Sequence, residues 1–171
     1  MPETLAQFSE QLMATSVAEW CAVVLAIGYV VFAARQNSLC WLCAFLSTAL
    51  YTWLFWQVTL PFQSALNAYY MVMAVYGFYK WGAGDEGTAV KTWPLYWHLA
   101  LVPAALLAAY GLSQLLSGQF NTNHLWLDAS IHLLSVVTTF MVAHKVLENW
   151  LYWFFINLAS AYLYAQNGLV L

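Results

Sequence analysis

Long apolar stretches, separated by short polar interruptions, run through the whole chain. Six of them are long enough to cross a bilayer as helices, and they lie at Val17–Ala34, Leu39–Gln57, Phe62–Trp81, Trp93–Leu116, Leu125–Ala143 and Leu147–Ala165. Each has 18 residues or more and lacks the alternation of apolar and polar residues that marks a lipid-facing barrel strand. The pattern therefore predicts an all-α protein built from six helices.

Composition places these helices in a membrane. Hydrophobic residues make up 64% of the 171 residues and charged residues only 6%, whereas soluble domains are about 25% charged. So few charges cannot cover a water-facing surface, and we expect a single integral membrane domain over residues 1–171. Four basic residues and a net charge of −3 also exclude a basic groove for nucleic acid.

The basic residues predict the orientation of the chain. Arg35, Lys80, Lys91 and Lys145 fall in alternate connections between the predicted helices, so all four lie on one side of the membrane. Because basic residues concentrate in cytoplasmic loops, that side is predicted to be cytoplasmic and the N-terminus to lie outside.

The first two helices resemble the fifth and sixth when the chain is shifted by 109 residues. This shift pairs Glu19 with Asp128, Arg35 with His144, Trp41 with Trp150, Phe45 with Phe154 and Gln57 with Gln166. The copies cross in the same direction, which predicts a parallel repeat. The copy of the third helix would begin only at Leu171, so we expect the last helix of the second bundle to be missing from the chain as given.

Polar and aromatic side chains recur at helical spacing inside three of the spans, and polar groups there usually face a cavity or a partner. The predicted binding residues are Trp150, Trp153, Asn157 and Tyr164 on the sixth helix, Gln63, Asn67 and Tyr70 on the third, and Thr48 and Tyr51 on the second. Indole faces attract flat cations, and amides offer paired donors and acceptors. We therefore expect a central site for a flat, cationic heterocycle.

Other interpretations stay open at this point. His98 and His132 lie at comparable depths in their predicted helices, as the axial ligands of a haem in a redox membrane subunit would. The polar stripes would also suit helix association in an assembly subunit.

Cys40 and Cys43 lack the further ligands of a zinc site, and no catalytic motif is present, so we expect neither an enzyme nor a bound metal. Glu19 and Asp128 are expected to be hydrated or structural.

Two segments resemble the PnuC family of bacterial vitamin transporters: Trp41–Trp81, which ends in LNAYYMVMAVYGFYKW, and Glu148–Leu169, which reads ENWLYWFFINLASAYLYAQNGL. The most specific parts are the YGxYxW ending at Tyr76–Trp81 and the WxxWxxxN pattern at Trp150–Asn157. The resemblance implies two parallel three-helix bundles joined by a linker helix, as in SWEET transporters. Here the bundles would be residues 17–81 and 125–171 and the linker residues 93–116, in the bacterial inner membrane.

The resemblance also implies a function. Family members carry nicotinamide riboside, thiamine or riboflavin by facilitated diffusion, and a cytoplasmic kinase traps the product. The substrate would lie between two rocking bundles, against the stripes of the third and sixth helices. The STALYTWLF and YYMVMAVYG stretches look more like the thiamine branch, so thiamine is the first expectation and nicotinamide riboside the alternative. A homo-oligomer is compatible with the sequence.

Overall fold

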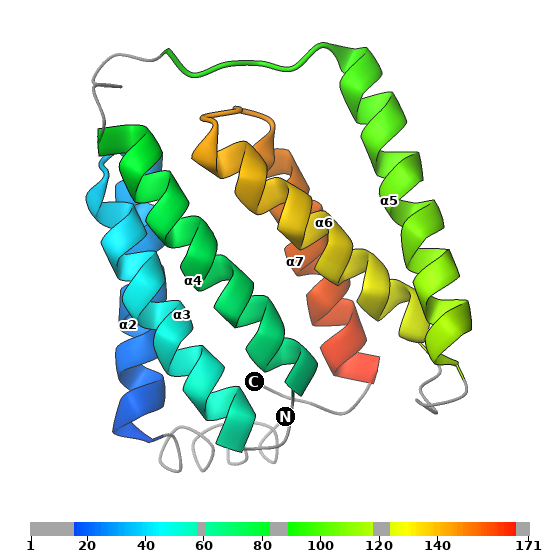
Figure 1. Ribbon diagram of the computed structural model, residues 1–171, viewed down its shortest axis with the longest axis horizontal. Coiled ribbons are helices and arrows are strands. Elements are labelled where there is room, and N and C mark those ends of the chain that lie inside the picture. Colours follow the sequence, from blue (N-terminus) through cyan, green and yellow to red (C-terminus); the bar gives the residue numbers. More distant parts are fainter. Residues whose placement is uncertain (1–15, 58–60, 83–88, 118–123, 167–171) are drawn as a thin grey trace, which may run out of the picture. The chain divides into compact units, whose positions relative to one another are not determined.

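The computed structural model describes residues 16–57, 61–82, 89–117 and 124–166, and most of these residues are helical (Figure 1). The helices are α2 (Val17–Ala34), α3 (Leu39–Gln57), α4 (Pro61–Gly82), α5 (Leu95–Leu116), α6 (Leu125–Ala143) and α7 (Asn149–Gln166). They match the six predicted segments to within two residues at each end. Parts of the predicted breaks at Thr59–Pro61, Gly82–Thr92 and Ser117–Asn123 lie outside the described residues, as does Leu171.

Four helices, α2, α3, α5 and α6, are apolar and long enough to cross a membrane. The other two, α4 and α7, are less apolar, because they carry the amide and tyrosine side chains that the sequence singles out. The chain is thus an all-α integral membrane protein, and its two less apolar helices carry seven of the nine residues expected to bind a ligand.

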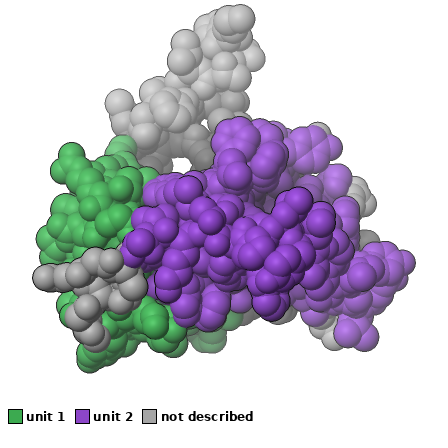
Figure 2. Space-filling view, turned by 90° about the horizontal axis from the view of Figure 1, so that it is seen from above, with its two compact units in different colours: residues 1–88, 171 green, residues 89–170 purple. Residues whose placement is uncertain are grey.

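The helices belong to two compact units, with α2, α3 and α4 in the first and α5, α6 and α7 in the second (Figure 2). In the first unit, α3 packs against both α2 and α4. The hydroxyl of Ser47 on α3 donates to the Ala22 carbonyl on α2 at 2.9 Å. On the other side of α3, Trp41 meets Trp81 of α4 edge-on, with ring centroids 5.4 Å apart.

In the second unit, α6 packs against both α5 and α7. The indole nitrogen of Trp126 on α6 donates to the Leu106 carbonyl on α5 at 3.3 Å. Ahead of α5, the chain pairs with the turn between α6 and α7, because the Lys91 N–H donates to the Lys145 carbonyl at 2.9 Å. The helix expected to be a linker therefore packs against α6, and its His98 Nδ1 reaches the Tyr152 hydroxyl of α7 at 2.8 Å.

The turns that follow α2 and α6 have the same geometry. Gln36 and Lys145, which are related by the 109-residue shift, have φ angles of 54° and 55°, and they are the non-glycine residues with positive φ in the described ranges. In each turn the next N–H donates back into the preceding helix, from Asn37 to Phe32 at 2.9 Å and from Val146 to Met141 at 3.0 Å. The two helix pairs therefore reverse direction in the same way at positions that the sequence shift relates.

Candidate functional site

Thr48 and Tyr51 lie on the side of α3 that points toward the rest of its unit. The exposed side chains of Leu42 and Trp53 mark the opposite side of the helix. Thr48 donates its hydroxyl to a carbonyl one turn earlier at 2.7 Å, and Tyr51 stacks on Phe55 with ring centroids 5.8 Å apart. The Thr48 hydroxyl oxygen still has acceptor capacity for a ligand.

The predicted stripe on α4 coincides with the buried side of that helix. Ala74 and Trp81, which continue the helical spacing of Gln63, Asn67 and Tyr70, are 1% and 5% exposed, so this part of the helix face serves packing. Asn67 is buried as well, and its amide nitrogen donates to the Gln63 carbonyl at 2.9 Å. That bond uses the amide nitrogen and not the side-chain oxygen, while Gln63 and Tyr70 are both partly exposed.

Two contacts fix how α3 and α4 lie against each other. Near the start of α4, the Ser64 hydroxyl donates to the Thr52 carbonyl at 2.9 Å, and near its end Trp81 meets Trp41. These contacts make the helices antiparallel and in register, so the residues between them share a depth. Thr48 is thereby brought level with Tyr70, and Tyr51, about one turn away, is brought level with Asn67.

The predicted residues of α7 lie outside the contact that this helix makes with α6. Trp150 is 40% exposed, whereas its repeat partner Trp41 is 2% exposed. Asn157 is exposed and Trp153 partly exposed, while the Tyr164 side chain lies outside the described part of the structure. An exposed amide on a helix in a membrane is costly unless it meets a cavity or a partner. The binding role of these α7 residues stays a prediction.

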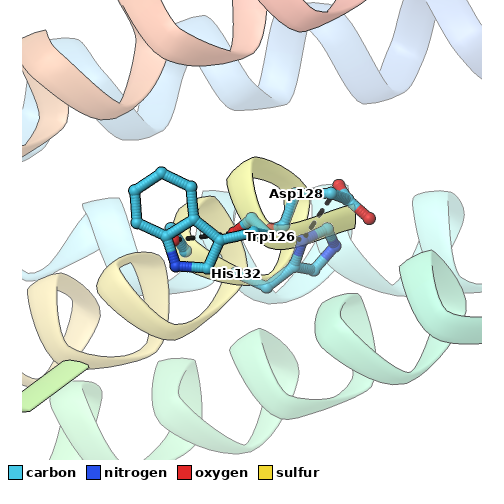
Figure 3. A network of polar contacts seen from close by, with 4 residues as sticks. Trp126, Asp128 and His132 are labelled. Atoms are coloured by element: carbon cyan, nitrogen blue, oxygen red, sulfur yellow. Dashed lines mark hydrogen bonds and ion pairs between the residues drawn. The ribbon is translucent and has the colours of Figure 1, made fainter. Parts of the chain in front are cut away.

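The two histidines proposed as haem ligands both use Nδ1 within the protein. The Nδ1 of His132 lies 2.8 Å from the Asp128 carbonyl oxygen and 3.4 Å from its carboxylate, one turn earlier on α6 (Figure 3). The Nδ1 of His98 lies 2.8 Å from the Tyr152 hydroxyl. Both Nε2 atoms are buried and have no hydrogen-bond partner in the part of the chain that the structure describes.

The sequence alone does not show that these two Nε2 atoms are buried. The four-residue spacing of Asp128 and His132 is visible in the sequence, but the burial of the ring nitrogen depends on packing. No group of three or more His, Cys, Asp or Glu side chains suited to a metal ion occurs within the described ranges.

Glu19 has a structural position at the start of α2. Its carboxylate accepts the Ser16 N–H at 2.6 Å, and its own N–H donates to the Ser16 hydroxyl at 3.3 Å. This reciprocal capping stabilises the first turn of the helix, which confirms the structural role expected for this residue.

The whole described region matches a known family. Residues 16–171 match the family model described as nicotinamide mononucleotide transporter. The chain belongs to this family. It is a family of membrane transporters and not of enzymes, and it includes the PnuC proteins that the sequence resembles. Together with the apolar helices, this makes the chain a multi-pass protein of the bacterial inner membrane.

Two curated relatives are named nicotinamide riboside transporter PnuC, one from Escherichia coli (strain K12) and one from Shigella flexneri. Each is 22% identical to this chain over 152 residues, which covers 72% of this chain and 63% of the relative. The chain thus spans less than two thirds of the length of these curated relatives. No solved structure matches the chain significantly.

Proposed function

We propose that this protein transports nicotinamide riboside across the inner membrane by facilitated diffusion. The observation that carries the proposal is the family match over residues 16–171, together with two relatives that are named as nicotinamide riboside transporters. These comparisons favour nicotinamide riboside over thiamine, the first expectation from the sequence. Thiamine stays in the test as the competing substrate because both vitamins are flat cations.

The residues proposed to bind the vitamin are the α7 stripe and the polar residues of α3 and α4. The positively charged nicotinamide ring would lie on the indole faces of Trp150 and Trp153, since cation–π contacts strengthen when they are desolvated. Asn157 and Asn67 would donate to and accept from the carboxamide and the ribose hydroxyls. The remaining members of the site are Gln63, Tyr70, Thr48, Tyr51 and Tyr164.

The proposed mechanism is a rocking of two three-helix bundles about this site. The helices α2–α4 would form the first bundle, α5 the linker, and residues 125–171 the second bundle. The identical turns after α2 and α6 support a common origin of the two bundles. A cytoplasmic kinase would then trap the vitamin by phosphorylation, and the four basic residues support a cytoplasmic side opposite the N-terminus.

The test is calorimetric titration of the purified protein with nicotinamide riboside, thiamine and riboflavin in parallel. We expect Trp153→Ala to weaken binding of nicotinamide riboside by roughly 2- to 30-fold, because one cation–π contact is worth about 0.5–2 kcal/mol. Trp53→Ala is the matched control, since Trp53 lies on the exposed side of α3, opposite Thr48 and Tyr51. Asn157→Ala should weaken binding as well, by the loss of hydrogen bonds.

Three outcomes would overturn parts of the proposal. Tighter binding of thiamine than of nicotinamide riboside would make thiamine the substrate. Unchanged binding of nicotinamide riboside by Trp153→Ala would remove the α7 stripe from the site. Binding of no vitamin, combined with a haem absorbance band that His98→Ala or His132→Ala removes, would replace the transporter with a redox subunit.

A further inference from the structure

A groove of about 470 Å³ lies within the second unit, between α5, α6 and α7. Leu127 and Ile131 of α6 form part of its lining, with Leu106 on the α5 side and Phe155 and Ala159 on the α7 side. None of these residues belongs to the proposed vitamin site.

Each polar side chain in the lining of the groove already has a hydrogen bond within the protein. Its polar side chains are Trp126, Ser130 and Tyr152. The Trp126 indole donates to the Leu106 carbonyl at 3.3 Å, the Ser130 hydroxyl donates to the Trp126 carbonyl at 2.7 Å, and the Tyr152 hydroxyl lies 2.8 Å from His98 Nδ1. A vitamin placed here would lose hydrogen bonds to water without replacement, which costs free energy for each group. The groove therefore suits an apolar occupant.

The groove faces away from the predicted vitamin stripe on α7. Phe155 and Ala159 each lie two residues from Asn157, and two residues turn a helix by about 200°. A molecule in the groove thus contacts the side of α7 opposite Trp153 and Asn157, and it does not compete with the vitamin for the same side chains.

One end of the second unit has the basic and aromatic residues that are typical of the lipid headgroup region of a membrane. Lys91 is exposed there, and its N–H is bound to the Lys145 carbonyl. Tyr96 and Trp97 are 63% and 53% exposed, as aromatic residues at a membrane interface often are. The acidic residue at this end, Glu148, accepts the Trp93 N–H with its two carboxylate oxygens at 3.2 and 3.3 Å.

The end of the second unit that contains Lys91 lies close to the groove along the chain. Tyr152 follows Glu148 by one turn of α7 and is itself part of the groove lining. A chain that starts beside Lys91 therefore reaches the groove after about 5–10 Å, one to two helical turns. The groove volume would hold roughly 16 groups of about 30 Å³, the volume of one molecule in liquid water, and a methylene group is of similar size. An acyl chain of a common phospholipid has this length.

We propose that the groove binds one acyl chain of an anionic phospholipid, whose phosphate lies beside Lys91. Basic residues at the cytoplasmic surface attract anionic headgroups. The acyl chain fills an apolar space in which contact between water and the lining would be unfavourable. The inference is independent of which vitamin the protein carries.

The test is native mass spectrometry of the full protein released from detergent with phosphatidylglycerol or phosphatidylcholine of equal chain length. We expect the wild type to retain one phosphatidylglycerol and to hold it more tightly than phosphatidylcholine. Ala159→Phe places a ring inside the groove and should reduce retention of both lipids at least tenfold. Ala104→Phe is the matched control, because Ala104 lies two residues from both Val102 and Leu106 and is exposed on the other side of α5.

A second pair of variants tests the headgroup contact. Lys91→Gln should weaken phosphatidylglycerol binding about fivefold, to the level of phosphatidylcholine, whereas Lys80→Gln in the first unit should not. If Ala159→Phe does not fold, Ala159→Leu makes the same test with a smaller side chain and a smaller expected loss.

Several results would overturn the proposal. Equal lipid retention by Ala159→Phe and Ala104→Phe would show that the groove does not hold the chain, and equal retention of the two lipids by the wild type would remove the anionic headgroup. Loss of vitamin binding with unchanged lipid binding in Ala159→Phe would make the groove a substrate site. Dissociation of a dimer by the same variant would make it a protein interface.

Discussion

Close contact between Trp41 and Gly77 shows how single residues determine the first unit. The Trp41 ring is 2% exposed and lies against Tyr29, Trp81 and the backbone at Gly77. A Cβ atom at position 77 would overlap the Trp41 indole, which is a large, rigid ring. The YGxYxW ending therefore has a packing role in addition to its value as a family signature.

We expect Gly77→Ala to destabilise the protein by about 1–3 kcal/mol, because it overpacks a buried contact. Gly111→Ala is the control, since its new methyl group meets nothing within 4 Å and glycine is a poor helix residue. The measurement is the thermal unfolding midpoint of both variants in detergent. Equal stability of the two variants would contradict the packing role.

At the scale of helices, the first pair is joined by a buried hydrogen bond between the Ser47 hydroxyl and the Ala22 carbonyl. We expect Ser47→Ala to cost about 0.6 kcal/mol, the average for bonds between helices in a membrane. Ser113→Ala removes a hydroxyl that is equally buried but bound within its own helix at 2.8 Å, so its cost should be smaller. Chemical unfolding of both variants and the wild type in mixed micelles measures the free energies of unfolding. A larger loss of stability in Ser113→Ala than in Ser47→Ala would contradict the role of the bond between the helices.

The helices could be predicted from the sequence because long apolar runs and polar breaks act locally. The cap at Ser16 begins α2. Gln36 and Lys145, which have positive φ, follow the ends of α2 and α6, where the pattern changes. The site could be predicted only in part. Helical spacing finds the stripe on α4, but it does not reveal that Ala74 and Trp81 are buried against α3 while Asn157 stays exposed. Burial depends on contacts between helices that are far apart in the sequence.

At the scale of the whole molecule, the proposed uniport makes a quantitative prediction, because nicotinamide riboside and thiamine carry a positive charge. A uniporter moves that charge without a compensating ion, so the membrane potential acts on the substrate. One elementary charge crossing 100 mV gains about 2.3 kcal/mol, which corresponds to an accumulation of about 50-fold.

Vesicles that contain the purified protein, and no kinase, should therefore take up nicotinamide riboside to equal concentrations at zero potential and to about 50-fold at 100 mV, inside negative. Potassium gradients with an ionophore set the potential, and Trp153→Ala is the control for transport through the proposed site. Accumulation at zero potential that a protonophore abolishes would contradict uniport. It would direct attention to Asp128 and His132, whose carboxylate and ring nitrogen lie 3.4 Å apart, and Asp128→Asn would then have to abolish the accumulation while leaving equilibration intact.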